Sequence, residues 1–283
     1  MSYIHLEKKQ SMPTSSRMLT WGAAVLLAIC LAACGGVSPA SSASASPTAG
    51  MTSVACTGGL PAGCHIRLLV FSKTAAFRHA SIPDAIAALR MLAIRQHVAI
   101  DFTENAAIFN DANLSHYAAV VFLLTTGNVL DVVEQTAFER YIQHGGGFAG
   151  VHSASDTGYN WPWYGQLVGA YFQNHSRVVQ ATVHVVDPAH LSTSMLPTRW
   201  VRTDEWYNFR TNPRNTVHVL LMVDENTYRG GEMGAYHPIA WYHSFDGGRA
   251  WYTAMGHTSA SYHEPLFLAH LWGGILYAAG VEK

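Results

Sequence analysis

The folded part of this chain lacks cysteine. All four cysteines lie within the first 64 residues, and none occurs from His65 to Lys283. A thiol nucleophile is therefore excluded from that part of the chain. Cys56 and Cys64 flank a turn-rich loop, and in an oxidising compartment we expect them to form a local disulfide, with two free thiols as the alternative.

The N-terminus lacks an apolar run long enough to span a bilayer comfortably. Its apolar stretch covers only residues 21–31 and follows basic residues between positions 8 and 17. The stretch ends in small residues before Cys34, as in a bacterial lipobox. We predict a lipoprotein signal peptide at residues 1–33 and lipidation of Cys34; a plain signal peptide is the alternative. The protein is then expected in the cell envelope, extracytoplasmic and anchored by lipid on the periplasmic or outer side.

The segment after the leader is poor in charge and in large side chains. Residues 35–55 are small, polar and uncharged, so they cannot bury a core. We therefore expect a flexible tether at residues 34–63. The remaining residues, 64–283, are enough for one domain with a single sizeable core.

The sequence has no basic patch with interleaved aromatic residues. This excludes nucleic acid as an expected partner, and the chain without its leader is slightly acidic. Histidine is plentiful, with 16 in the chain, while lysine is scarce. Together with many Trp and Tyr residues, this composition suggests a surface suited to polar, ring-shaped ligands.

Strand and helix patterns alternate in the first half of the domain. Apolar runs predict strands at 65–72, 98–104, 117–126 and 147–151, and helical spacing predicts helices at 81–93 and 131–144. This alternation indicates an α/β fold with a three-layer, doubly wound, mostly parallel sheet. The second half predicts antiparallel additions and a closing helix, with strands at 178–186, 200–209, 217–224, 239–245 and 249–255 and the helix at 265–279.

The most informative run is residues 145–156, Gly-Gly-Gly-Phe-Ala-Gly-Val-His-Ser-Ala-Ser-Asp. An apolar strand ends here at a polar turn whose first side chain is His152. In an α/β enzyme with a nucleophile elbow, this place holds the catalytic Ser or Cys. Ligands of open α/β sheets bind at the carboxyl ends of the strands, where we expect three further runs to converge. These runs are 73–79, 204–209 and 256–258.

Four side chains in these runs are candidates for acid–base catalysis or for holding a metal ion. They are His79, His152, Glu205 and His257. Imidazole and carboxylate ligands suit a divalent, zinc-like ion, although no short zinc motif is present. Strand alternation turns Asp204 and Glu205 to opposite faces, and we place Glu205 in the site. His175 is a weaker candidate, and a structural role is the alternative for each residue.

Other residues are candidates for binding a sugar. Arg78 can hold a carboxylate or hydroxyl groups, and aromatic faces stack on sugar rings. We assign substrate binding to Arg78, Asp156, Trp161, Trp163 and Tyr207. Packing in the core or in a lid is the alternative for Trp161 and Trp163.

Six motifs across residues 65–281 resemble the ThuA-like (trehalose utilisation) family. They end at His79, His152, Gly165, Phe209, Trp241 and His257-Thr258. The resemblance implies the class I glutamine amidotransferase-like fold, with His152 at the position of the amidotransferase Cys and hence no glutaminase activity. It also implies a role in the metabolism of trehalose and 3-keto-disaccharides. The chain departs from the family pattern at Ser153, where alanine is expected.

The predicted function is that of an extracytoplasmic enzyme acting on a keto-glycoside or disaccharide. A ring ketone acidifies the neighbouring C–H, and His152 or Glu205 could remove that proton. The expected partners are a small carbohydrate, the membrane through the lipid anchor, and a sugar dehydrogenase. A non-catalytic sugar-binding lipoprotein is the main alternative. A hydrolase of ester or amide bonds is a further one, against which the missing Ser or Cys at the elbow argues.

Overall fold

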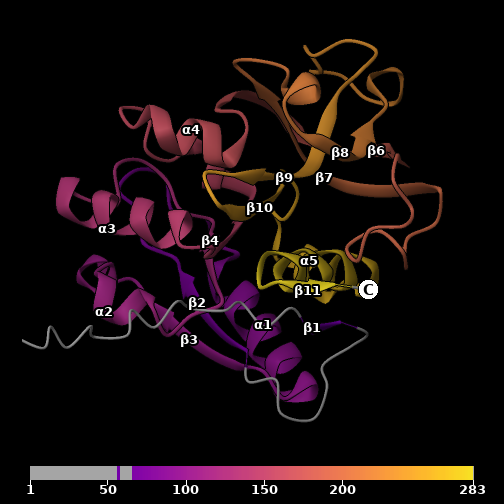
Figure 1. The fold of residues 1–283 in the computed structure, drawn as a ribbon. Coiled ribbons are helices and arrows are strands. Elements are labelled where there is room, and N and C mark those ends of the chain that lie inside the picture. The colour runs from indigo at the N-terminus through magenta and orange to yellow at the C-terminus, as the bar shows by residue number, and fades with distance from the viewer. Residues whose placement is uncertain (1–55, 58–65, 283) are drawn as a thin grey trace, which may run out of the picture. The chain divides into compact units, whose positions relative to one another are not determined.

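A nine-stranded sheet forms the centre of the structure. The computed structural model describes residues 56–57 and 66–282, which all belong to the unit of residues 50–283. The strand order is β3-β2-β4-β5-β10-β9-β8-β6-β7 (Figure 1). The lipidation site Cys34 and the disulfide partner Cys64 lie outside the described residues, so both assignments stay predictions.

The first five strands of this order are parallel to one another. Each is short, and the central strands β4 and β5 are apolar and buried throughout, as expected of strands covered on both faces, whereas the edge strand β3 is partly exposed. They are β3 (Ala99–Thr103), β2 (Arg67–Phe71), β4 (Ala119–Leu123), β5 (Gly147–Val151) and β10 (Gly248–Thr253). The predicted strands of the first half are confirmed, and β5 has the predicted bounds.

The other four strands are antiparallel. They are β9 (Pro238–Phe245), β8 (His218–Val223), β6 (Phe172–Val185) and β7 (Arg199–Phe209). The predicted hairpin between β9 and β10 is present, with Asp246 and Gly247 at its turn. β6 begins earlier than the sequence indicated, and its pairing with β7 shifts register between His175 and Val178. The result is a mixed α/β sheet.

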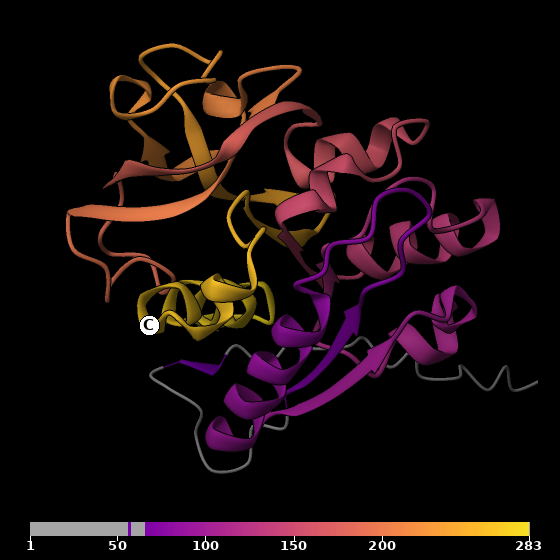
Figure 2. The same cartoon turned by 180° about the vertical axis from the view of Figure 1, so that it is seen from behind.

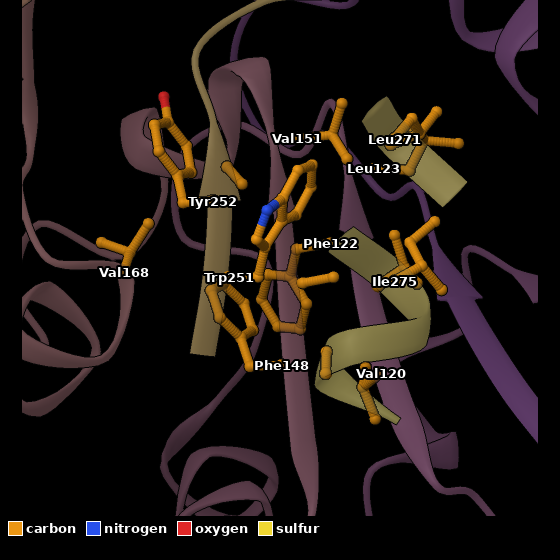
Figure 3. Packing of buried hydrophobic residues seen from close by; sticks show 14 of the residues in the cluster. Val120, Phe122, Leu123, Phe148, Val151, Val168, Trp251, Tyr252, Leu271 and Ile275 are labelled. Carbon is orange, nitrogen blue, oxygen red and sulfur yellow. The ribbon is translucent and has the colours of Figure 1, made fainter. Parts of the chain in front are cut away.

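Helices cover the parallel part of the sheet. They are α1 (Ile82–Gln96), α2 (Asp111–Leu114), α3 (Val132–Gln143), α4 (Pro162–Val168) and α5 (Pro265–Ala278). α5 packs on β10, β5 and β4 and contacts α1, while α3 and α4 contact β10. In Figure 3, Tyr252 and Val168 lie on one side of β10, and Leu271 and Ile275 lie on the other. Asp131 and Glu134 form a capping box that starts α3.

Two adjacent glycines let α5 approach the sheet closely. A Cβ at Gly274 would lie 2.0 Å from the ring of Trp251, and one at Gly273 would lie 2.5 Å from the carbonyl oxygen of Leu191. Helix-interior glycine costs stability in isolation, so its presence here reflects close packing. Trp251 is fully buried beneath the helix.

A short pair of strands joins the two ends of the described chain. β1 (Cys56–Thr57) pairs in parallel with β11 (Val281–Glu282). Of the two strands, β1 lies within residues 34–63, where the sequence predicts a tether, and that assignment stays a prediction. Within residues 56–57 and 66–282, no helix has the length and hydropathy needed to cross a membrane.

Candidate functional site

The site lies at the carboxyl ends of the parallel strands, where Glu205 of β7 meets three histidines. His79 lies between β2 and α1, His152 directly follows β5, and His257 follows β10. Glu205 lies within β7. These four residues, which we call the His/Glu cluster, each offer one ligand atom, and the four atoms lie within 4.8 Å of one another. The sequence prediction of a converging set at the strand ends is thus realised in space.

His152 has the backbone of a strained turn. Its φ is +51°, a left-handed conformation that non-glycine residues rarely adopt, and its side chain is fully buried. Strain of this kind is typical of a functional turn at a strand tip. The Nδ1–H of His152 donates to the carbonyl oxygen of Ala254 at 2.6 Å. This bond leaves Nε2 facing the cluster, towards Glu205 and His257.

Three of the ligand atoms lie at spacings that suit one metal ion. Nε2 of His152 is 3.5 Å from Oε2 of Glu205 and 3.2 Å from Nδ1 of His257. Nδ1 of His257 is 3.1 Å from the same Glu205 oxygen. Tetrahedral zinc with ligand distances of about 2.0–2.1 Å places its ligand atoms about 3.3–3.4 Å apart. The observed spacings therefore fit a zinc-like ion.

Electrostatics favour the metal-coordinating protonation state at two of the four residues, Glu205 and His79. Burial acts to raise the pKa of Glu205, but hydrogen bonds from His152 and His257 and their charges hold it at about 2. Burial, together with the nearby charges of His152 and His257, lowers the pKa of His79 to about 3. For His257, burial acts to lower the pKa, but the hydrogen bond to Glu205 and the negative charges of Glu205 and Asp204 together outweigh it, so the pKa is raised. Glu205 is therefore a carboxylate and His79 a neutral imidazole at neutral pH.

Asp204 supports the loop that carries His257. Its oxygens accept backbone N–H bonds from Gly256 at 2.9 Å and from His257 at 3.1 Å. Arg202 makes an ion pair with Asp204 at 3.0 Å, and both side chains are buried. Glu205 lies in the cluster and Asp204 does not, which is the placement that the sequence analysis predicts. Ser81 helps on the other side, donating from Oγ to the carbonyl oxygen of His257.

His175 lies closer to the cluster than the sequence indicated. Its Nδ1 is 3.0 Å from Oε1 of Glu205, the carboxylate oxygen that does not face His152 and His257. Its side chain is 47% exposed, so His175 lies on the solvent side of Glu205. The sequence predicts His175 only as a weaker candidate, since it indicates a strand from residue 178 and not from Phe172, where β6 begins.

Two predicted substrate-binding residues lie beside the cluster. The ring of Tyr207 covers that of His152, with centroids 4.2 Å apart. Asp156 accepts a hydrogen bond from Tyr159, and burial raises the pKa of its carboxyl group. Ser153, where the chain departs from the family pattern, places its Oγ 3.4 Å from Nδ1 of His79.

The other three predicted sugar ligands make their contacts with residues outside the His/Glu cluster. Arg78 is exposed and makes an ion pair with Glu104. Trp161 is buried and donates to Glu139 on α3. Trp163 donates to Asp246 in the β9–β10 turn, at the end of β10 opposite to His257. These contacts favour packing over a sugar platform for both tryptophans.

The fold and the cluster define an α/β protein with a polar site of three histidines and one glutamate. The chain belongs to the ThuA family, described as trehalose utilisation, whose profile matches residues 67–278. The resemblance inferred from the sequence is confirmed. A comparison with curated proteins gave no match.

Solved structures share the fold at low sequence identity. A protein described as ThuA-like from Bacteroides uniformis is 24% identical with a TM-score of 0.63, over 76% of this chain and 94% of that one. One from Parabacteroides merdae is 19% identical with a TM-score of 0.64, over 76% and 90%. A β-galactosidase from Bacillus circulans is 13% identical with a TM-score of 0.51, over 77% of this chain but 31% of that one.

Proposed function

We propose that this ThuA-family protein is an enzyme that binds a divalent metal ion and acts on a keto-glycoside or keto-disaccharide. The metal ligands are His79, His152, Glu205 and His257. The observation that carries the proposal is the convergence of four ligand atoms within 4.8 Å from four separate segments of the chain. The family's role in trehalose utilisation supports a carbohydrate as the substrate class.

The residues fit a metal ion in their chemistry as well as their spacing. Metal-bound histidines usually donate their other ring N–H to a protein acceptor, and His152 does so to Ala254. The ligand set combines nitrogen with one carboxylate, which suits zinc or another transition metal. A bound ion would polarise the carbonyl oxygen of the substrate.

The reaction we propose needs no external oxidant or reductant. A base removes the proton on the carbon next to the ketone, and the C–O bond at the following carbon then breaks. Its electron pair leaves with the glycosidic oxygen, which takes a proton, and the ring keeps a new C=C bond beside the ketone. In a metal-free version of this chemistry, Glu205 or His152 is the base. Both versions keep the sum of oxidation states unchanged.

We extend the proposal to the setting of the enzyme. Cys34 carries a lipid that holds the domain at the extracytoplasmic side of a membrane, and a sugar dehydrogenase supplies the ketone. The layering is that of class I glutamine amidotransferases, with glutaminase activity lost. What supports the loss is the imidazole of His152 at the elbow and the absence of cysteine from residue 65 onward.

The test combines metal analysis with product analysis. The purified full chain is assayed for bound metal and incubated with native and 3-keto disaccharides, with and without chelator. We expect about one bound divalent ion per chain and conversion of a keto-disaccharide that the chelator abolishes. Turnover that survives complete metal removal would support the metal-free version instead. Recovery of every bound saccharide unchanged would refute catalysis and support a sugar-binding lipoprotein.

A further inference from the structure

Phe77 is unusual among the aromatic residues of this protein. Its side chain is 64% exposed, whereas every other Phe, Tyr and Trp in residues 66–282 is buried or half-buried. Leaving a phenylalanine in water forgoes the stabilisation that burial of its ring would give. Such a position suggests that the ring has a use on the surface.

The loop that carries Phe77 is firmly held. Thr126 donates from Oγ1 to the carbonyl oxygen of Phe77 at 2.7 Å, and its own carbonyl accepts from the N–H of Ala75 at 2.8 Å. Lys73 also donates to the carbonyl of Val129 across the same pair of loops. The exposure of Phe77 is therefore not the result of a loosely attached segment, because the backbone presents the ring in one place.

The ring of Phe77 also lies next to the His/Glu cluster. Its centroid is 4.8 Å from that of His79, with the planes at 85°. His79 in turn lies 4.8 Å from His152 and 5.1 Å from His257, whose side chain is 24% exposed. An apolar ring thus borders the cluster on a side that solvent can reach.

We propose that Phe77 is a stacking platform for a sugar ring of the substrate. The C–H face of a pyranose is apolar and packs on an aromatic face, while its hydroxyl groups stay available for polar partners. Arg78 and Glu104, exposed beside the platform, offer a donor and an acceptor of that kind. This inference deepens the proposed function and rests on its substrate class. It also supplies the aromatic surface that Trp161 and Trp163, packed elsewhere, do not provide.

The experiment measures binding separately from turnover. Calorimetry with the full chain gives the Kd for trehalose and for 3-keto-trehalose in wild type, Phe77→Ala and Phe77→Trp. Ile94→Ala is the matched control, because Ile94 is 66% exposed but lies 12 residues along α1, about 18 Å from its start. Metal content and thermal unfolding are recorded for each variant.

We expect Phe77→Ala to weaken binding by about tenfold, which corresponds to ~1.4 kcal/mol. Phe77→Trp should bind as tightly as wild type or more tightly, and Ile94→Ala should match wild type. Unchanged binding by Phe77→Ala, with wild-type turnover intact, would overturn the platform and leave the proposed function standing. Loss of binding in a protein that never turns the sugar over would support the platform and refute the enzyme. A wild type that binds neither sugar would refute both.

Discussion

The parallel and antiparallel parts of the sheet contribute to the site in different ways. His79, His152 and His257 all follow parallel strands, at the edge where such strands place their ligands. Glu205 comes from the middle of β7, the outermost antiparallel strand. In the parallel part, each histidine reaches the site because it follows a strand that ends there. In the antiparallel part, Glu205 reaches the site because of the way the sheet bends.

The sheet must curl for Glu205 to reach His152. Five strand spacings separate β5 from β7, which would be about 24 Å in a flat sheet. The two side chains are instead 3.5 Å apart. β6 and β7 are the longest strands, drawn in salmon and orange in Figure 2 and lying apart from the indigo and magenta strands of the parallel part. The register shift in β6 follows His175, whose Nδ1 is 3.0 Å from Glu205. Substitutions at the ends of the parallel strands therefore test the proposed reaction, and substitutions in β7 test whether this strand contributes a metal ligand.

The largest effect is expected at the parallel strand tip, from His152→Asn. Asparagine tolerates a positive φ better than alanine does, so the variant removes the imidazole with little added backbone strain. We expect turnover of a keto-disaccharide to fall by about 10²–10⁴-fold. His116→Asn, at an exposed loop residue, is the control. Full activity of a folded His152→Asn would remove His152 from the mechanism.

The matching change in the antiparallel part is Glu205→Gln. Glutamine keeps the shape of the side chain but removes the charge that faces His152 and His257. Since loss of an outer-shell partner already costs ~10–100-fold in metal affinity, loss of a ligand should cost at least ~100-fold. Metal titration of the apo protein measures the change. A variant that binds metal as tightly as wild type would show that β7 closes over the site without contributing a ligand.

The parallel part was the more predictable from sequence. The bounds of β5, the turn at His152 and the helix that begins after Asp131 all depend on local signals, such as an apolar run, a glycine pair or a capping box. The convergence of His79, His152 and His257 then follows from a general rule about parallel sheets. Strand alternation placed Asp204 and Glu205 on opposite faces, and the aromatic residues that follow Glu205 favoured Glu205 as the site residue.

The antiparallel part was predictable in its elements but not in its contacts. The early start of β6, which brings His175 to Glu205, has no strong apolar pattern because the strand alternates exposed and half-buried residues there. The curl that carries Glu205 over the strand ends depends on tertiary packing. The roles of Trp161 and Trp163 were also not predictable from sequence. A run of aromatic residues is compatible with packing or with sugar binding, and only the contacts with Glu139 and Asp246 decide between them.

A smaller effect is expected one step away from the cluster, from Asp204→Asn. An amide has one acceptor oxygen, so it cannot accept from both Gly256 and His257 while facing Arg202. We expect metal affinity to fall ~10-fold, as for other residues behind metal ligands. The temperature of thermal unfolding should also fall, because the buried charge of Arg202 loses the opposite charge of Asp204.

Glu264→Gln separates positioning from stability in that experiment. This variant removes the charge of the second carboxylate beside Arg202, which lies 3.4 Å away. The side chain of Glu264 accepts a hydrogen bond from Trp200, whereas Gly256 and His257 donate to Asp204. We expect it to lower the unfolding temperature without changing metal affinity. Equal losses of metal affinity in both variants would show that Asp204 acts through general stability and not by placing His257.

The smallest effect concerns His270, a buried histidine on α5 that lies under the parallel part and outside the cluster. Its Nδ1–H donates to the carbonyl of Ser192, and its Nε2 accepts from the hydroxyl of Thr253. Both ring nitrogens of the neutral imidazole therefore have a hydrogen-bond partner. Burial lowers the pKa of His270 to about 3, and the charge of Arg202 adds to the shift.

The stability of the fold should therefore depend on pH through His270. The unfolded histidine takes up a proton near pH 6.5, whereas the folded one stays neutral down to about pH 3. The unfolded state thus binds more protons in this range, and the free energy of unfolding should fall as the pH drops from about 6.5 toward 3, with a slope approaching one proton. In His270→Gln, this part of the slope should disappear, and in the exposed His116→Gln it should persist. Denaturant unfolding between pH 5 and 8 measures both, and an unchanged slope in His270→Gln would refute the assignment.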